Sequence, residues 1–461
     1  MAGAVQQAHG DGMSLYTKII SGGLFPLHER LKGHNSVELL HAMERSQWLP
    51  AQEMQQLQVQ NLREFLVRIG RDVPYYRALF SELKFDPAGI TCIDDLQQLP
   101  LTGKADIRAN MDRLKADNAG VLEKFSTGGS SGEPLIFYRG KERVSHDVAA
   151  KWRATRWWDV DIGDPEIVVW GSPIELGSQD RIRLVRDKLL RTELLSAFEM
   201  SNANMLQFTQ RIKKMRPRML FGYPSSLALL AEYVTSNGYA VDNLGIKVVF
   251  VTSEKLYPHQ RELIEAAFGA PVANGYGGRD AGFIAHQCPQ GALHITAEDI
   301  VVEIVSEDGE VLPAGEKGEI VVTHLNTGDF PFVRYRTGDV GSVSEESCSC
   351  GRGLPILAEI EGRSTDFVTA ADGTVLHGLA LIYVLREIPE VEEFKIVQES
   401  LTRITLQLVT SSSDTANLER TVTEQFRRRL GDSLVVDFVY VNNIEREASG
   451  KFRYVVSKLA K

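Results

Sequence analysis

The sequence is poor in cysteine, has no long apolar run and carries no excess of positive charge. Four cysteines in 461 residues are too few for the disulfide framework that stabilises small secreted domains. No segment approaches the roughly 18 apolar residues that a membrane-spanning helix needs, and no signal peptide is visible at the amino terminus. We therefore expect a cytoplasmic protein with no membrane partner.

The charge balance is acidic. Aspartate and glutamate outnumber lysine and arginine by 61 to 51, which gives a net charge of −10. A surface of this kind argues against a nucleic-acid partner, because nucleic acids are bound through clustered positive charge. Hydrophobic residues make up 43% and charged residues 24% of the chain, as in ordinary globular proteins. A chain of this length is expected to fold as two or three domains.

The hydrophobic pattern changes along the chain. The first hundred residues read as helical, and residues 51–70 place apolar side chains on one helical face. Short apolar runs rich in valine and isoleucine then appear, and such runs are typical of buried strands; they are residues 166–170, 247–251, 300–305 and 319–322. Helical segments at 225–237 and 258–268 alternate with them. Strands alternating with helices predict an α/β fold.

The last hundred residues read as a separate, small α+β unit. Strands are expected at 394–398, 404–409 and 434–441, with a charged helix at 417–430. The polar stretch before them contains glycine and aspartate and is typical of a hinge. We accordingly divide the chain into a large amino-terminal domain (1–360), a linker (361–374) and a small, mobile carboxy-terminal lid (375–461).

Residues 125–134 (FSTGGSSGEP) contain three glycines and four hydroxyl residues. Glycine lets backbone N–H groups approach an anion closely and hydroxyls add donors, so this composition is typical of a polyphosphate cradle. It is not a Walker-type loop, because no Lys-Ser or Lys-Thr follows Gly132, and residues 275–280 (GYGGRD) lack the final glycine of the dinucleotide pattern. On composition alone, the run fits a flexible surface loop equally well.

Further short motifs accompany this loop in a fixed order. They are VPYY (73–76), LPLT (99–102), GYPS (222–225), YGGRD (276–280), YRTGD (335–339), EGR (361–363) and SGK (449–451). Each motif is weak alone, but their order and spacing over nearly the whole chain resemble the adenylate-forming (acyl-CoA synthetase-like) superfamily. The resemblance is greatest to its phenylacetate-CoA ligase branch, which includes capsule-biosynthesis and coenzyme F390 synthetase-like proteins.

The resemblance implies an enzyme that joins ATP to a carboxylic acid, releases pyrophosphate and passes the acyl group to coenzyme A. ATP, Mg²⁺ and coenzyme A would be its small-molecule partners beside the acid, and the chain would act alone or as a homodimer. Two alternatives stay open. The enzyme could use a partner other than coenzyme A, either by forming an amide with an amine or by transferring AMP to a phenol, or the chain could bind nucleotide without catalysis.

The resemblance also implies roles for individual residues of the large domain. The residues that would wrap the β- and γ-phosphates are Ser126, Thr127, Gly128, Gly129, Ser130, Ser131 and Gly132. Gly275, Tyr276 and Gly277 would lie along the adenine, and Asp339 would accept the ribose hydroxyls. Asp280 stands where the family usually has a glutamate that holds Mg²⁺, so its carboxylate is one carbon shorter. Tyr223 is the candidate for the substrate pocket.

Two residues beyond the large domain would complete the reaction site. Lys451 resembles the family's catalytic lysine, whose ammonium would bridge the attacking carboxylate and the α-phosphate. Arg363 would contact the ribose or phosphate. The hinge departs from the family's Gly-Arg-x-Asp-Asp, because Thr365 precedes Asp366, and either residue would carry the rotation of the lid.

Three of the four cysteines lie in short sequence patterns, one with a histidine and two with each other. Cys288 is followed by His294, and Cys348 and Cys350 flank a single serine. Three thiolates and one imidazole suit a tetrahedral, structural Zn²⁺ site, and zinc-binding members of the resembling branch carry a similar set. His286 is an alternative imidazole ligand, and buried reduced cysteines are the alternative to a metal site. We expect the metal to staple two loops near the nucleotide site.

Overall fold

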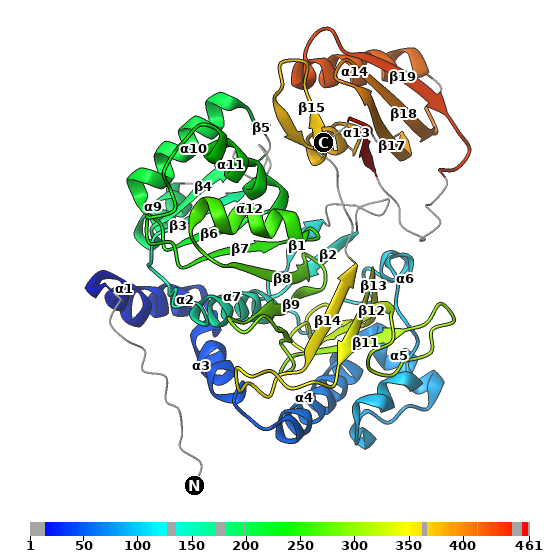
Figure 1. The fold of residues 1–461 in the computed structure, drawn as a ribbon. Coiled ribbons are helices and arrows are strands. Elements are labelled where there is room, and N and C mark those ends of the chain that lie inside the picture. The colour runs from blue at the N-terminus through cyan, green and yellow to red at the C-terminus, as the bar shows by residue number, and fades with distance from the viewer. Residues whose placement is uncertain are drawn as a thin grey trace.

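The computed structural model describes residues 14–126, 135–171, 181–197, 199–361, 367–386, 388, 390–412, 414–444 and 454–459. The fold is α/β, as predicted: a large sheet of mixed direction is flanked by helices, and a smaller α+β unit follows (Figure 1).

The amino-terminal part is helical up to residue 109. Its elements are α1 (Leu15–Ile19), the π-helical turn η1 (Ile20–Leu24), α2 (Phe25–Lys32), α3 (Ser36–Ser46), α4 (Ala51–Asp72), α5 (Pro74–Leu83), the 3₁₀ turns η2 (Pro87–Gly89) and η3 (Ile93–Gln98), and α6 (Lys104–Ala109). Helix α4 confirms the predicted amphipathic segment, because Leu62, Leu66 and Ile69 point from one face into the core and are fully buried. Pro74 starts α5 at a position where a missing N–H costs nothing.

A hairpin and a long helix come next. Strands β1 (Glu123–Ser126) and β2 (Ile136–Arg139) pair antiparallel, with Ser126 opposite Ile136. Helix α7 (Lys141–Arg156) begins directly after β2 and packs against α3 and β9. The chain of the glycine-rich loop therefore leaves from β1 and returns through β2 into α7.

One half of the 11-stranded sheet is parallel. Its elements are β3 (Glu166–Trp170), α9 (Arg181–Leu190), β4 (Thr192–Ser196), α10 (Asn202–Met215), β6 (Met219–Gly222), α11 (Pro224–Ser236), β7 (Val248–Thr252), α12 (Pro258–Phe268) and β8 (Val272–Gly278). All five residues of β7 are buried, as expected for a strand covered on both faces.

The order of these strands reverses next to β3. From β3 the chain goes to β4 on one side, and then to β6, β7 and β8 on the other side. Ligands of open α/β sheets bind in the crevice at the carboxyl ends of the strands where such a reversal occurs. The topology therefore marks the edge that follows Trp170 and Gly222.

The other half of the sheet is antiparallel and continues from β8. Its strands are β9 (Gly282–Gln287), β10 (Leu293–Ile295), β11 (Ile300–Val305), β12 (Gly318–His324), β13 (Phe332–Ser344) and β14 (Ile356–Glu361), in the spatial order β9-β10-β14-β13-β12-β11. Residues of these strands share one apolar core with α4 and α5. Helices α3 and α4 lie below β14 in Figure 1.

The carboxy-terminal unit has an apolar core of its own. Its elements are β15 (Phe367–Thr369), β16 (Val375–His377), α13 (Leu379–Arg386), β17 (Val391–Ser400), β18 (Arg403–Thr410), α14 (Thr415–Leu430), β19 (Val435–Tyr440) and β20 (Val455–Ser457). The strands and the helix predicted for this unit are present, and the four-stranded sheet has the order β19-β18-β17-β20. Within the segment predicted as the linker, residues 367–369 form β15.

A short strand of the large domain joins the carboxy-terminal unit. Strand β5 (Glu199–Met200) pairs antiparallel with β16, with Val375 opposite Met200 and Leu376 opposite Glu199. Met200 and Leu376 are both buried. The hairpin of β15 and β16 is therefore one docking contact between the two parts of the chain, which lie one above the other in Figure 1.

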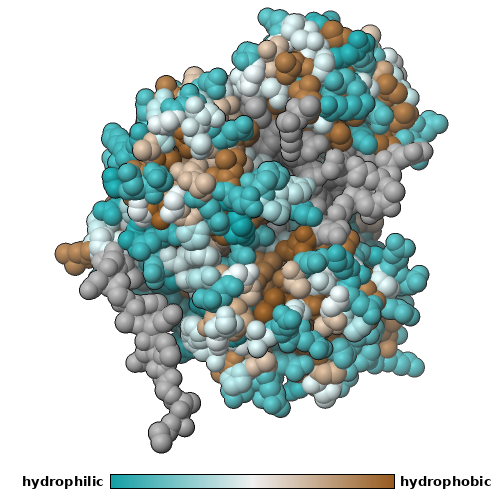
Figure 2. Space-filling model, in the orientation of Figure 1, coloured by the Kyte–Doolittle hydropathy of each residue, from teal (hydrophilic) through white to brown (hydrophobic). Residues whose placement is uncertain are grey.

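In the view of Figure 2, polar residues cover most of the surface, and apolar residues gather near the middle of the molecule, below the carboxy-terminal unit. Among the helices of the described residues, none has both the length and the apolar character needed to cross a bilayer.

Candidate functional site

The carboxyl edge of the parallel strands collects the residues singled out by the sequence motifs. Tyr223 follows β6 and Tyr276 is in β8; Glu254, which none of the motifs contains, lies two residues beyond β7. The ring of Tyr223 stacks on that of Trp170, at the end of β3, with 4.1 Å between centroids. The two stacked rings therefore lie at the point where the strand order reverses.

Tyr276 and Asp339 meet although they come from different halves of the sheet. The Tyr276 hydroxyl donates a hydrogen bond to Asp339 Oδ2 at 3.1 Å. The backbone around Asp339 is shaped by Gly338, which has a φ of 76°, and by the Thr337 hydroxyl, which accepts a hydrogen bond from the Asp339 N–H at 3.1 Å. The two residues to which the resemblance assigns adenine and ribose contacts are therefore neighbours.

Asp280 lies in the turn between β8 and β9 and is held from two sides. The hydroxyl of the fully buried Tyr335 donates to Asp280 Oδ2 at 2.6 Å, and the Ala281 N–H donates to Oδ1 at 3.0 Å. Each oxygen of a carboxylate has two acceptor positions, so each can accept a bond in addition to the one that a described residue donates to it. Carboxylate oxygen is a ligand type that Mg²⁺ prefers, and Asp280 therefore fits a magnesium site.

The amino-terminal LPLT motif supports the strand that carries Tyr335 and Asp339. The Thr102 N–H donates to the Arg334 carbonyl, and the Thr102 carbonyl accepts from the Arg336 N–H, both at 2.9 Å. Arg334 is buried, donates to the Leu99 carbonyl at 2.7 Å and forms a two-pronged ion pair with Glu303 at 2.9 and 3.0 Å. The φ of Arg334 is 48°, a conformation that non-glycine residues adopt only when their surroundings impose it.

Two glycines of the YGG region are required by packing. A Cβ on Gly277 would lie 2.1 Å from the Gly282 carbonyl oxygen, and a Cβ on Gly275 would lie 2.9 Å from the Phe250 ring. Both contacts are too close for any side chain, whether or not a nucleotide is present. Gly277 therefore has a structural role in the β8–β9 pairing, and Gly275 has one in the packing of β8 against Phe250 of β7, in addition to any ligand contact.

Several predicted site residues lie outside the part of the chain that the structure describes. They are Thr127, Gly128, Gly129, Ser130, Ser131 and Gly132 of the phosphate loop, Arg363, Thr365 and Asp366 of the hinge, and Lys451. Ser126 is described and is exposed at the end of β1.

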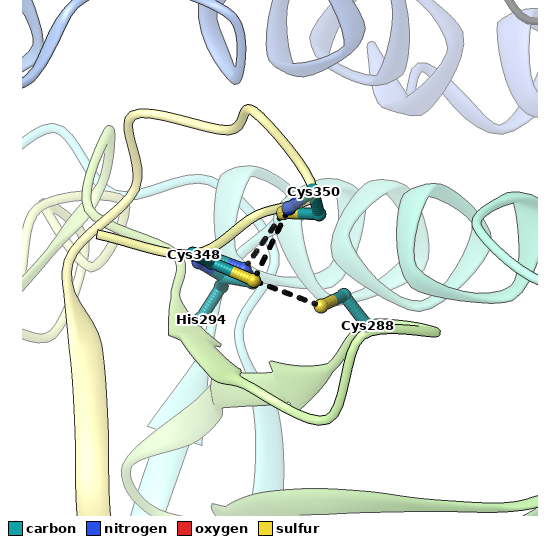
Figure 3. A group of neighbouring side chains, drawn as sticks. All are labelled: Cys288, His294, Cys348 and Cys350. Carbon is teal, nitrogen blue, oxygen red and sulfur yellow. Dashed lines mark hydrogen bonds between the residues drawn. The ribbon is translucent and has the colours of Figure 1, made fainter. Parts of the chain in front are cut away.

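The three cysteines and the histidine come together in one cluster (Figure 3). Cys288 follows β9, His294 is in β10, and Cys348 and Cys350 lie in the connection between β13 and β14. Their ligand atoms all lie within 4.8 Å of one another. Of the two histidines considered from the sequence, His294 belongs to this cluster, whereas His286 is not part of it.

The S···S distance in the cluster fits a tetrahedral zinc site. Cys288 Sγ and Cys348 Sγ are 3.7 Å apart, and Cys350 Sγ is 3.2 Å from His294 Nε2. A tetrahedron with Zn–S bonds of about 2.3 Å has S···S edges of about 3.8 Å. His294 Nδ1 donates to the Leu354 carbonyl at 3.1 Å, so Nε2 carries the lone pair that a metal needs. The donor set and the tautomer therefore both fit Zn²⁺.

The pKa values of two thiols of the cluster shift in opposite directions. Burial raises the pKa of the Cys288 thiol to about 12. For Cys350, burial acts to raise the pKa, but hydrogen bonds from the backbone and side chain of Arg352 outweigh it and lower the pKa. A bound metal would have to displace the Cys288 proton, because only thiolates ligate zinc.

The cluster lies at the end of β9 away from the Asp280 turn, whereas Gly275 of β8 stands opposite His286, two residues before Cys288. Asp280 precedes the first residue of β9, whereas Cys288 follows its last residue. A strand of six residues spans roughly 20 Å. The cluster joins the β9–β10 hairpin to the loop near Trp48, where the Arg352 guanidinium lies 4.8 Å from the Trp48 ring. The cluster therefore lies against the junction of α3 and α4.

Sequence reasoning missed the residues that hold Asp280. Tyr335 belongs to a motif that was recognised, but only the structure shows that its hydroxyl reaches Asp280. Arg143 of α7 donates to the Asp280 carbonyl at 3.0 Å, across a sequence separation of 137 residues. The only sequence signal for Arg143 is its place in the first turn of the helix that follows the phosphate loop.

Two protein-family models match the chain. The family of AMP-binding enzymes matches residues 196–327, and the CapK C-terminal domain matches residues 368–458. The first match covers β5, the parallel strands β6 to β8, the Asp280 turn and the strands β9 to β12, and the second covers most of the carboxy-terminal unit.

Curated relatives match over most of their length. The CapK protein of Staphylococcus aureus is 25% identical over 415 residues, which cover 88% of this chain and 89% of the relative. The phenylacetate-coenzyme A ligase of Thermus thermophilus is 25% identical over 405 residues, with 85% and 86% covered. Among solved structures, a 2-hydroxyisobutyryl-CoA ligase in the thioesterification state superimposes with a TM-score of 0.63 at 23% identity, covering 90% of this chain and 91% of that one.

Proposed function

We propose that this chain activates a carboxylic acid with ATP and transfers the acyl group to coenzyme A. The chain belongs to the adenylate-forming superfamily, on the branch of the CapK protein and the phenylacetate-CoA ligases. In the first step a carboxylate oxygen attacks the α-phosphorus of ATP, the bond to the bridging oxygen breaks and pyrophosphate leaves. In the second step the thiol sulfur of coenzyme A attacks the acyl carbon, its proton is released and AMP leaves.

The observation that carries the proposal is the arrangement of Tyr276, Asp339, Asp280 and Tyr335. Two hydrogen bonds, Tyr276 to Asp339 and Tyr335 to Asp280, tie the YGG and YRTGD motifs together at the carboxyl edge of the parallel strands. A carboxylate with two oxygens suits the two ribose hydroxyls, and a second carboxylate nearby suits Mg²⁺. The relatives named phenylacetate-coenzyme A ligase and the AMP-binding match support the same chemistry.

Each candidate residue takes a role in this proposal. Asp339 binds the ribose, Tyr276 lies along the adenine with Gly275 and Gly277, and residues 126–132 donate to the β- and γ-phosphates. Asp280 is the ligand through which Mg²⁺ would be held, and the ion would neutralise phosphate charge. Lys451 and Arg363 supply positive charge to the reacting carboxylate and phosphate. Tyr223 forms part of the wall against which the acid lies.

The lid must change its contacts between the two steps. The β5–β16 pairing docks the carboxy-terminal unit in the arrangement seen here. Rotation about the 362–366 segment, with Thr365 or Asp366 as the pivot, would break that pairing and bring another face of the unit to the site.

Zinc has a structural role in this proposal. All four ligands of a tetrahedral site are supplied by the protein, so no coordination position is left for substrate. The ion would hold the β9–β10 hairpin to the β13–β14 connection.

Mass spectrometry with Mg·ATP and a pool of aryl, short-chain and hydroxy acids tests the proposed reaction. We expect AMP, pyrophosphate and a CoA thioester of one acid or a few related acids when coenzyme A is present. Acyl adenylate or AMP that forms at the same rate with and without coenzyme A would instead favour an amine or phenol acceptor. ATP binding with no acid-dependent product in a broad pool would contradict the proposal and favour a non-catalytic role.

Replacing Asp339 by alanine is expected to weaken ATP binding by at least about tenfold, because two charge-assisted hydrogen bonds to the ribose are lost. Isothermal titration calorimetry with ATP measures the change. Tyr276→Phe is the matched variant: it removes the hydroxyl bonded to Asp339 but keeps the ring, and it should weaken binding much less. Unchanged ATP affinity in Asp339→Ala would remove Asp339 from the nucleotide site.

A further inference from the structure

Arg143 is a buried arginine that connects two parts of the site. It lies in the first turn of α7, the helix that follows the phosphate loop, and its side chain is only 2% exposed. Its Nη1 donates to the Asp280 carbonyl at 3.0 Å, and its Nη2 donates to the Arg279 carbonyl at 3.4 Å. The guanidinium therefore holds the backbone of the turn that presents the Asp280 carboxylate.

Asp147 fixes the direction of the Arg143 guanidinium. Arg143 Nε donates to both oxygens of Asp147, one helical turn later, at 3.0 and 3.1 Å. Burial acts to raise the pKa of Asp147, but the charge of Arg143 together with the interactions of His146 and Arg139 outweighs it, so the pKa is lowered. Asp147 is thus a carboxylate at neutral pH. Because the guanidinium is planar, anchoring Nε to Asp147 aims the two Nη groups at the turn.

Gly282 lies next to the Arg143 guanidinium, where there is no room for a side chain. Gly282 has a φ of 89°, and a Cβ there would lie 2.9 Å from both Arg143 Nη2 and His324 Nε2. No side chain at this position could coexist with Arg143 in its present place. Glycine at position 282 therefore leaves the space that the Arg143 guanidinium occupies.

His146, Asp147 and His324 lie within 4.8 Å of one another, which is close enough for shared metal ligation. Two observations favour the arginine as the occupant of this region. Arg143 already engages both oxygens of Asp147, and a guanidinium repels a second cation. His324 Nδ1 accepts the Asn326 N–H at 3.3 Å, so the neutral ring carries its proton on Nε2, which then has no lone pair for a metal.

We propose that Arg143 is a positioning residue for the magnesium ligand Asp280, a role that rests on the proposed function. Arg143 holds the backbone of the 279–280 turn, while Tyr335 holds the carboxylate itself at 2.6 Å. An aspartate reaches one carbon less far than the glutamate that the family usually has at this place. Because aspartate also has one rotatable bond fewer, the position of its backbone decides more directly where the carboxylate lies.

The test compares ATP binding with and without Mg²⁺ by titration calorimetry of the full-length chain. For the wild type we expect Mg²⁺ to strengthen ATP binding. In Arg143→Ala that strengthening should fall by about tenfold, the effect of losing charge-assisted hydrogen bonds, while the Kd for ATP in EDTA stays within about twofold. Arg143→Lys, which keeps a donor and the charge, should recover part of the Mg²⁺ effect.

Arg153→Ala is the matched control. Arg153 lies on the same helix, is 1% exposed and is paired with Glu298 at 2.6 Å, so its loss costs stability without touching the Asp280 turn. If Arg143→Ala weakened ATP binding equally with and without Mg²⁺, the positioning role would be overturned. It would also be overturned if Arg153→Ala reduced the strengthening by Mg²⁺ as much as Arg143→Ala does.

Gly282→Ala provides a second variant should Arg143→Ala fail to fold, because the added methyl group displaces the guanidinium from the space that it occupies. Like Arg143→Ala, this variant should reduce the strengthening of ATP binding by Mg²⁺. An unchanged strengthening would count against the proposal. A wild-type chain that binds no ATP in either condition would instead contradict the proposed function.

Discussion

Replacing Lys451 by alanine is expected to abolish acyl-adenylate formation and to leave ATP binding largely intact. The ammonium would neutralise charge that develops as the carboxylate oxygen approaches the α-phosphorus, and it is needed in the transition state more than in the ground state. Loss of one such preorganised charge lowers kcat by about 10²- to 10³-fold or more. Acid-dependent exchange of labelled pyrophosphate into ATP measures the adenylation step alone, and titration calorimetry measures ATP binding.

Lys458→Ala is the control for the Lys451 variant. Lys458 lies on the same carboxy-terminal unit, and its ammonium is paired with Glu399 at 2.8 Å on an exposed surface. Removing a surface pair of this kind has little effect on stability and should leave adenylation unchanged. Wild-type exchange rates in Lys451→Ala would end the assignment of Lys451 as the catalytic lysine.

Replacing Cys288 by serine is expected to remove zinc from the protein and to lower its stability strongly. Structural zinc contributes about 10–16 kcal/mol of apparent binding free energy in isolated zinc-finger peptides. In this chain the cluster also packs against a hydrophobic core, so we expect a smaller loss, on the order of 5 kcal/mol. Elemental analysis should give one zinc per chain for the wild type and almost none for the variant, and thermal unfolding should begin at a clearly lower temperature.

Cys92→Ser is the matched control for the zinc prediction. Cys92 is a free cysteine outside the cluster and is partly exposed, so its replacement should alter neither zinc content nor unfolding. The same decrease in thermal stability should follow when the wild type is treated with a strong chelator. A wild-type chain that carries no zinc and unfolds unchanged in the presence of chelator would show that the cluster is a group of reduced cysteines.

Much of the fold follows from local patterns. The apolar face of residues 51–70 is the buried face of α4, and the valine-rich runs at 166–170 and 300–305 are β3 and β11. Such predictions succeed because the period of the apolar residues is set by the geometry of the element itself. The strand runs did not reveal direction: β3 is in the parallel half and β11 in the antiparallel half of one sheet. Direction depends on which strand lies alongside, and that is decided by chain topology.

The candidate site divides in the same way. By itself the sequence determined the α/β class, the order of the motifs, their resemblance to a family, and the residue types at the candidate nucleotide and zinc sites. Only the tertiary structure decided that Tyr335 and Arg143 hold Asp280, that His294 and not His286 joins the cysteines, and that the cluster lies at the far end of β9. The reason is physical: spacing along the chain encodes local geometry, whereas the contact of Arg143 with Asp280 joins residues 137 positions apart. Such a contact exists only once the strands and helices between them have packed.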